Sequence, residues 1–168
     1  MNTKVINILG GPCTGKSTVS AELYAFLKKQ NISCEMALEY AKDKVWAESL
    51  EVLEDQIYVF GHQHHRIFRL LGKVEVVICD SPLLLSIIYD KEQRKVLKEL
   101  VLFEHFKTNS LNIMLKRATK FEEKGRYHTL EQSKEIDNNI KRMLNEDKID
   151  FFECYNEEVC SLVWNELR

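Results

Sequence analysis

The chain has 168 residues, 45% of them hydrophobic, and this length allows one domain with a buried core but scarcely two. Lys and Arg total 24 against 26 Asp and Glu, and the formal net charge of -2 excludes a general electrostatic attraction to nucleic acid or to an anionic membrane surface. Any anionic ligand must therefore be bound by a local site.

Five cysteines are spread along the sequence with no Cys-x-x-Cys pair, which argues against a disulfide framework and against a zinc site. The apolar run near the N-terminus is too short for a signal peptide, and no segment approaches the roughly 18 consecutive apolar residues of a membrane span. We therefore expect a soluble cytoplasmic protein with reduced thiols and no membrane partner.

The first half of the sequence alternates short apolar runs with segments of helical periodicity. Residues 5–10 form a β-branched run that predicts a strand, and apolar residues recur at helical spacing over 16–31. The same patterns predict a strand over 32–38, a helix over 54–72 that ends at Gly72, and a strongly apolar strand over 74–80.

The second half continues this alternation. Pro82 marks the first turn of helical material that extends to residue 106. After it we expect a strand over 111–117, a polar and charged stretch over 118–129, a helix over 130–148, a strand over 150–155 and a helix over 156–168. Alternating strands and helices predict an α/β fold of three layers with a mostly parallel sheet of about five strands, because parallel strands need crossovers that cover both faces.

Residues 10–17, with the sequence GGPCTGKS, match the phosphate-loop pattern G-x-x-x-x-G-K-[ST] between the first predicted strand and helix. Such a loop turns backbone N–H groups inward around a phosphate, and it needs glycine where a Cβ would obstruct that approach. Lys16 would neutralise the β- and γ-phosphates, and the helix N-terminus would add unpaired N–H groups. The sequence predicts binding of ATP or another triphosphate by Gly10, Gly11, Pro12, Cys13, Thr14, Gly15, Lys16, Ser17, Thr18 and Arg117.

Two carboxylates follow predicted strands, and ligands bind at the carboxyl ends of the strands in such sheets. Asp80 ends the strand VVICD and, with the Ser17 hydroxyl, would hold Mg²⁺; it could instead cap a helix ahead of Pro82. Glu39 closes the second strand and would accept the proton of an acceptor hydroxyl, although a solvated glutamate at a strand end is the alternative.

The polar stretch after the fourth predicted strand has the composition of a lid. It contains Lys124 and Arg126 around Gly125, and a lid that closes over the site would exclude water. Arg126 is the predicted contact to the transferring phosphoryl group. The alternative is a charged loop that is merely solvated.

The segment GHQHHR over 61–66 lacks cysteine or carboxylate partners at metal-ligand spacing, so metal binding is not favoured. We expect this helix to form one wall of an acceptor pocket, with ordinary surface placement as the alternative. The predicted acceptor contacts are Glu39, Tyr40, Tyr58, His62 and Gln63. Trp46 and Trp164 stand among apolar neighbours at helical spacing, which predicts core positions for both.

The reaction class follows partly from what is missing. No N-K-x-D sequence is present for guanine recognition, and the chain is short for the coupling elements of a motor or an AAA-type ATPase. A small fold with a charged excursion favours phosphoryl transfer to a small acceptor. Two other classes stay open, namely a binding module controlled by the bound triphosphate and an NTPase that serves a larger assembly.

The ordered segments GGPCTGKST, EYAKDKV, FGHQHHR, VVICDSPLLLSIIYD and NIMLK resemble those of small P-loop kinases of the AAA_28 type, a group that includes ribosylnicotinamide kinase domains. The resemblance covers nearly the whole chain and implies one kinase domain over 1–168. It implies ATP- and Mg²⁺-dependent phosphorylation of a nucleoside-like acceptor, with Glu39 and Asp80 as the acidic pair, Gln63 facing the acceptor and Arg126 as the lid cation.

The chain departs from this family pattern at two points. Relatives often carry Glu-Tyr-Gly/Ala-Arg after the second strand and Asp-Arg or Asp-Thr-Asp after the third, whereas this chain has Glu39-Tyr40-Ala41-Lys42 and Asp80-Ser81-Pro82. Lysine does not reproduce the bidentate contact of arginine. The acceptor therefore stays open among deoxynucleosides, nucleoside monophosphates, nicotinamide riboside and modified bases in DNA, although the absence of a basic surplus disfavours a polymer.

Overall fold

The computed structural model describes residues 2–117 and 129–168, and within them five strands form one parallel sheet. The strand order is β2-β3-β1-β4-β5, as expected for an α/β fold with a phosphate loop after the central strand. The prediction of an α/β fold with a parallel sheet of five strands is confirmed. The strands are β1 (Lys4–Leu9), β2 (Cys34–Ala37), β3 (Val76–Cys79), β4 (Asn109–Leu115) and β5 (Phe152–Cys154).

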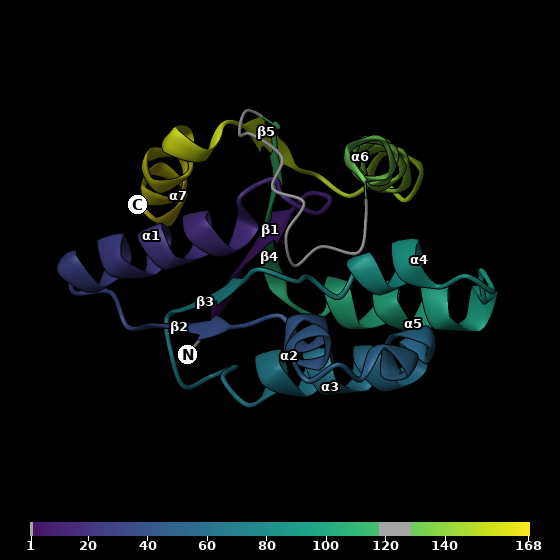
Figure 1. Ribbon diagram of the computed structural model, residues 1–168. Coiled ribbons are helices and arrows are strands. Elements are labelled where there is room, and N and C mark those ends of the chain that lie inside the picture. Colours follow the sequence, from purple (N-terminus) through teal and green to yellow (C-terminus); the bar gives the residue numbers. More distant parts are fainter. Residues whose placement is uncertain (1, 118–128) are drawn as a thin grey trace.

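Helices cover both faces of this sheet, so the fold has three layers (Figure 1). Helices α1 and α7 lie on one face, and α3, α4, α5 and α6 pack on the other. The described helices are α1 (Lys16–Lys29), α2 (Tyr40–Trp46), α3 (Gln56–Phe68), α4 (Leu85–Tyr89), α5 (Lys95–Phe106), α6 (Leu130–Glu146) and α7 (Val159–Leu167), with 3-10 turns η1 (Leu50–Glu54) and η2 (Asn156–Glu158).

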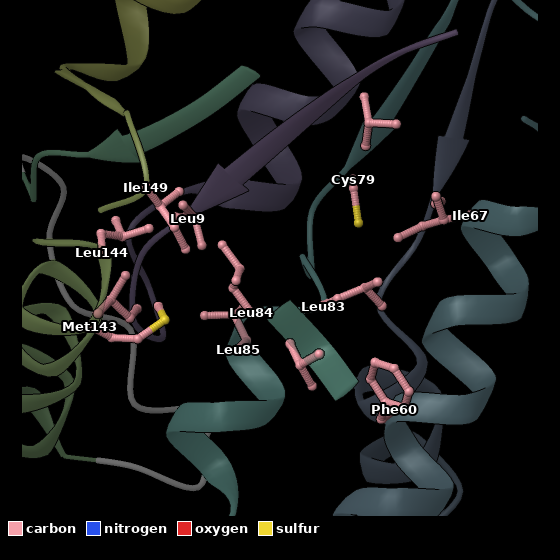
Figure 2. Packing of buried hydrophobic residues seen from close by; sticks show 14 of the residues in the cluster. Leu9, Phe60, Ile67, Cys79, Leu83, Leu84, Leu85, Met143, Leu144 and Ile149 are labelled. Atoms are coloured by element: carbon pink, nitrogen blue, oxygen red, sulfur yellow. The ribbon is translucent and has the colours of Figure 1, made fainter. Parts of the chain in front are cut away.

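The side chains of β1 alternate between two hydrophobic clusters, one on each face of the sheet. Ile6 and Ile8 pack with α1 and α7, whereas Val5 and Leu9 pack with the helices of the other layer. Figure 2 shows Leu9 close to Leu84 of the turn before α4. Because both faces are buried, β1 is mainly apolar, as is typical of parallel sheets, and its buried polar residue Asn7 donates a hydrogen bond to Oδ1 of Asn112 at 2.9 Å.

The helical material predicted after β3 is divided into two helices, α4 and α5. Asp90 ends α4, and its carboxylate accepts hydrogen bonds from the backbone N–H of Arg94 at 2.7 Å and from its Nε at 3.1 Å. Gln93 adopts a positive φ of 51° within the same turn. The side chain of Asp90 thus replaces a helical hydrogen-bond partner and allows the chain to turn before α5.

The tryptophans differ from the sequence prediction. Trp164 is half-buried and makes an edge-to-face contact with Phe26, with ring centroids 6.0 Å apart. Trp46, at the end of α2, is 75% exposed, so its predicted core position is wrong. Trp46 belongs to neither hydrophobic cluster, and Figure 1 shows α2 beside α3.

Among the residues that the structure describes, no helix combines the length and the apolar character needed to cross a membrane.

Candidate active site

The phosphate-loop sequence lies between the carboxyl end of β1 and the first turn of α1. Gly10 and Gly15 have positive φ angles of 151° and 91°, a backbone region that favours glycine. A Cβ on Gly10 would lie 2.6 Å from Oγ1 of Thr14, and a Cβ on Gly15 would overlap the side-chain nitrogen of Asn156. The loop is therefore a cradle in which glycine is required by both the dihedral angles and the available space.

Lys16 lies over this cradle as the first residue of α1. Its Nζ donates to the carbonyl oxygens of Gly10 at 2.8 Å and of Gly11 at 3.0 Å. The hydroxyl of Thr14 donates to the same Gly11 carbonyl at 3.0 Å and tightens the turn. The ammonium group and the N-terminal amide groups of α1 thus gather at one place, an arrangement that favours anion binding.

Asp80 follows β3 and stands beside the start of α1. Its side chain is 3% exposed, and Oδ1 has no hydrogen-bond partner among the described residues. Burial raises the pKa of this carboxyl above its usual range, while the Ser17 hydroxyl and the Lys16 ammonium pull the pKa in the opposite direction. Leu84, not Asp80, occupies the N-cap of α4, so a capping role for Asp80 in that helix has no support.

The oxygen atoms at this point suit a magnesium ion. Mg²⁺ prefers hard oxygen ligands and is usually held by one or two protein groups together with phosphate oxygens. A buried carboxylate oxygen without a partner, next to a serine hydroxyl, is such a donor set. Asp80 and Ser17 therefore fit the ion that the sequence pattern implies.

A cleft of about 530 Å³ opens beside the phosphate loop. Its polar part contains Lys16, Glu39 and Gln63, which come from three different elements, and its other part is apolar. Glu39 occupies the N-cap position of α2 directly after β2. The cleft is lined by Pro12, Cys13, Gly15, Lys16, Ser17, Thr18, Glu39, Ala41, Lys42, Val45, Trp46, Leu50, Leu53, Glu54, Gln56, Val59, Gln63, Ser81, Pro82, Leu85, Ser86, Tyr89 and Lys91.

Gln63, a predicted acceptor contact, lines this cleft from α3 together with Gln56 and Val59. It is 3% exposed, and its Oε1 accepts the backbone N–H of Tyr40 at 2.9 Å. Its Nε2 lies 3.7 Å from the sulfur of Cys79 at the end of β3. Gln63 therefore connects the first residue of α2 to the last residue of β3, which directly precedes Asp80.

Tyr40, Tyr58 and His62 do not line the cleft within the part of the chain that the structure describes. The Tyr40 and His62 rings stack with centroids 4.3 Å apart and an interplanar angle of 5°. Tyr58 is 45% exposed and packs against the same pair. Tyr58 and His62 are four residues apart on one face of α3, whereas Gln63 belongs to the buried face, so the helix separates them.

Tyr89, at the end of α4, lines the cleft but was not predicted from the sequence. Burial raises the pKa of its hydroxyl, and the carboxylates of Glu39 and Asp137 raise it further. The hydroxyl therefore stays protonated, as tyrosine does at its ordinary pKa, and keeps its ability to donate a hydrogen bond. The apolar run PLLLSIIY gave no sign of this role, because its periodicity reports only on packing.

Arg117 was predicted to bind the triphosphate, and the structure places it against the backbone of the phosphate loop. Its Nη1 donates to the carbonyl oxygen of Pro12 at 2.8 Å, and its Nη2 contacts Oδ2 of Asp137 at 2.8 Å. Asp137 of α6 was not predicted as a site residue. Asp137 lies on the same face of α6 as the buried Ser133 and Ile140. A carboxylate on a buried helix face is unusual, and this pattern could have identified Asp137 from the sequence.

The predicted lid cation Arg126, with Lys124 and Gly125, lies outside the described residues. Its proposed role therefore stays a prediction from the sequence. The phosphate loop, Glu39 and Asp80 follow the carboxyl ends of β1, β2 and β3. Together with Gln63 of α3 they lie at or beside the cleft.

Solved structures with a similar fold include the NadR protein and a deoxyadenosine kinase. The NadR protein in complex with NR has a TM-score of 0.70 at 19% identity; the match covers 90% of this chain and 45% of that chain, so this chain spans less than half of NadR. Deoxyadenosine kinase from M. mycoides with bound dATP has a TM-score of 0.55 at 19% identity and is matched over 98% of this chain and 99% of that chain. At these identities the similarity shows the fold alone.

A second structure of the M. mycoides kinase, with products dCMP and dCDP, has a TM-score of 0.54 at 18% identity. No curated protein matches the sequence. The AAA_28 family, described as an AAA domain, matches residues 5–159, a range that includes the glycine cradle, Glu39, Asp80 and Asp137. The chain therefore belongs to the AAA_28 family of P-loop domains.

Proposed function

We propose that the protein is an ATP- and Mg²⁺-dependent kinase that transfers the γ-phosphoryl group to a hydroxyl or phosphate of a nucleoside, nucleotide or modified base. The observation that carries this proposal is that three features lie at one cleft or directly beside it. These are the glycine cradle with Lys16, the buried carboxylate of Asp80 with an unpartnered oxygen, and the second carboxylate of Glu39. A phosphate donor and an acceptor can be accommodated side by side there.

The donor side uses backbone and ammonium groups. On binding, the polyphosphate would replace the Gly10 and Gly11 carbonyl oxygens as the partner of Lys16, and it would accept hydrogen bonds from the first amides of α1. Asp80 and Ser17 would hold Mg²⁺, which shields the charge on the phosphate oxygens and orients them for transfer. This arrangement stabilises charge mainly by position, as phosphoryl transfer requires.

The acceptor side has a polar and an apolar part. Glu39 stands at the polar part, and Val45, Leu50 and Leu53 form an apolar wall beside the exposed Trp46. An acceptor with a planar apolar portion and a hydroxyl group fits this division. The relatives with the same fold were solved with NR, dATP and dCMP, which supports a nucleoside-like acceptor.

Glu39 would act as the general base in this reaction. The acceptor oxygen forms a bond to the γ-phosphorus while its proton passes to the Glu39 carboxylate. The bond between the γ-phosphorus and the bridging oxygen breaks, and ADP leaves with that electron pair. When the acceptor is a phosphate, no proton transfer is needed, and Glu39 would contact a hydroxyl of that acceptor, because its carboxylate repels the phosphate oxygens.

The experiment is a transfer assay with γ-labelled ATP, Mg²⁺ and a panel of deoxynucleosides, nucleoside monophosphates, nicotinamide riboside and hydroxymethylated DNA. We expect label in one acceptor class. We expect Glu39→Gln to reduce kcat for a hydroxyl acceptor by about 10²- to 10⁴-fold at nearly unchanged ATP affinity. The matched control is Glu54→Gln, which removes an exposed carboxylate at the rim of the same cleft.

Two outcomes would contradict the kinase proposal. ATP binding by the wild type without label in any acceptor would favour a binding module controlled by the triphosphate. Rapid release of labelled phosphate that needs a protein partner but no acceptor would favour an NTPase.

A further inference from the structure

The carboxylate of Asp137, in α6, makes a direct hydrogen bond to the backbone of the phosphate loop. Asp137 of α6 accepts the backbone N–H of Gly11 through Oδ1 at 2.6 Å, and the two residues are 126 positions apart. Its other oxygen, Oδ2, accepts from Nε of Arg117 at 2.9 Å and from Nη2 at 2.8 Å. Both side chains of this ion pair are 13% exposed, so water screens the pair only weakly.

Arg117 completes the contact on the next residue of the loop. Its Nη1 donates to the Pro12 carbonyl at 2.8 Å while its Nη2 also reaches the carbonyl of Ser133 at 3.4 Å. The two side chains therefore engage an N–H of the loop and a C=O of the loop, with the charge of each balanced by the other. Such charge-assisted hydrogen bonds are stronger and more directional than neutral ones.

The close approach of α6 also explains why residue 11 is glycine. A Cβ on Gly11 would lie 2.6 Å from the carbonyl oxygen of Ser133 and 2.9 Å from Oδ1 of Asp137. The loop thus presses directly on the α6 backbone. The glycine pattern of the loop is required in part by this helix, in addition to any phosphate.

The loop needs support of this kind, because its backbone conformation is unusual. Gly10 and Gly15 have positive φ angles, and Cys13, which has a Cβ, also has a positive φ of 61°. A non-glycine residue in this region is strained and persists only where its surroundings hold it. The Gly11 and Pro12 contacts fix the residues that directly precede Cys13.

We propose that Asp137, acting with Arg117, is a positioning residue that holds the phosphate loop in its triphosphate-binding conformation. The inference rests on the proposed function, since it assumes that the loop binds the phosphate donor. Asp137 does not touch the phosphates in this arrangement; it fixes the Gly11 peptide so that the following amides keep their orientation. Its loss should therefore appear in donor binding and leave the acceptor side nearly unchanged.

The test compares Asp137→Ala and Asp137→Asn with the control Asp147→Ala, by calorimetric titration with MgATP. Asp147, at the end of the same helix, forms an ion pair with Lys98 at 2.8 Å and is similarly buried at 15% exposure, but it is not a residue of the cleft. We expect Asp137→Ala to raise the Kd for ATP about 10- to 100-fold, because it removes a charge-assisted bond to the loop and leaves Arg117 unpaired. Asp137→Asn keeps an oxygen acceptor for Gly11, so it should recover part of this affinity.

A steady-state measurement separates positioning from general stability. We expect the KM for ATP to rise in Asp137→Ala while the KM for the acceptor stays within about twofold, and we expect Asp147→Ala to change neither. ATP affinity equal to that of the wild type in both Asp137 variants would overturn the inference, as would an equal loss in Asp147→Ala. If Asp137→Ala does not fold, Asp137→Asn and Arg117→Lys carry the comparison.

The two proposals can fail separately. A wild-type protein that binds ATP but phosphorylates no acceptor would contradict the kinase proposal, while the Asp137 comparison would still be decided by ATP titration. A wild-type protein that does not bind any triphosphate would overturn both.

Discussion

The backbone conformation of the phosphate loop depends on Gly15, and Gly15→Ala tests this dependence. Gly15 has a φ of 91°, where an L-residue costs roughly 1–2 kcal/mol, and its new Cβ would overlap the side-chain nitrogen of Asn156. The Asn156 nitrogen is the end of a flexible side chain that can shift, so the backbone angle accounts for most of the expected cost. We expect the free energy of unfolding to fall by about 1–2 kcal/mol and ATP affinity to fall more than tenfold.

Gly61→Ala is the matched control for this substitution. Gly61 lies within α3, is exposed, and has open space where a Cβ would be placed. Alanine in a helix interior is favoured over glycine by about 0.5–1 kcal/mol, so this variant should be more stable than the wild type and should bind ATP normally.

Urea unfolding followed by circular dichroism gives the two free energies, and titration with MgATP gives the affinities. The two variants should differ in stability by roughly 2 kcal/mol and should move in opposite directions from the wild type. Normal ATP affinity in Gly15→Ala would refute the reasoning, because it would mean that the loop does not need its observed backbone conformation to bind phosphate.

The cysteines and one buried histidine give two further predictions. Cys13 lines the cleft, whereas Cys160 is a half-buried residue of α7. MgATP should therefore slow the alkylation of Cys13 by N-ethylmaleimide and leave that of Cys160 unchanged, as measured by mass spectrometry. Equal alkylation rates of Cys13 with and without MgATP would contradict its placement in the cleft. Burial lowers the pKa of His105 to about 4 from 6.5, so the folded state binds fewer protons than the unfolded state between these values. Stability should therefore decline as the pH falls below 6.5 and level off below 4, by an amount on the order of 3 kcal/mol. His105→Gln should weaken this decline in urea unfolding series, and an unchanged pH profile in that variant would exclude His105 as its cause.

The sequence predicted the elements whose signal is local. Alternation of apolar runs and helical periodicity was sufficient for the parallel sheet, and the glycine pattern placed the phosphate loop after β1. Asp80 and Glu39 could be found because each stands at the end of an apolar strand. These features depend on neighbours within a few residues, which is the range over which sequence patterns carry physical information.

Other features depend on contacts between distant segments. Asp137 meets Gly11 only because α6 packs against the phosphate loop, and Tyr89 lines the cleft from the end of α4, where Asp90 ends that helix. Trp46 was expected in the core because apolar spacing does not reveal that the end of α2 leaves it exposed beside the cleft. Such positions follow from tertiary packing, which overrides local preference.

The central claim is that the glycine cradle after β1 binds a nucleoside triphosphate through Lys16. Calorimetric titration of the wild type and of Lys16→Ala with ATP and Mg²⁺ tests it most directly, with the fold of the variant checked by circular dichroism. We expect saturable binding by the wild type and at least tenfold weaker binding by a folded Lys16→Ala, because the variant loses the ammonium group that neutralises the phosphates. Equal affinity in the two proteins, or no heat from any triphosphate with the wild type, would contradict the claim.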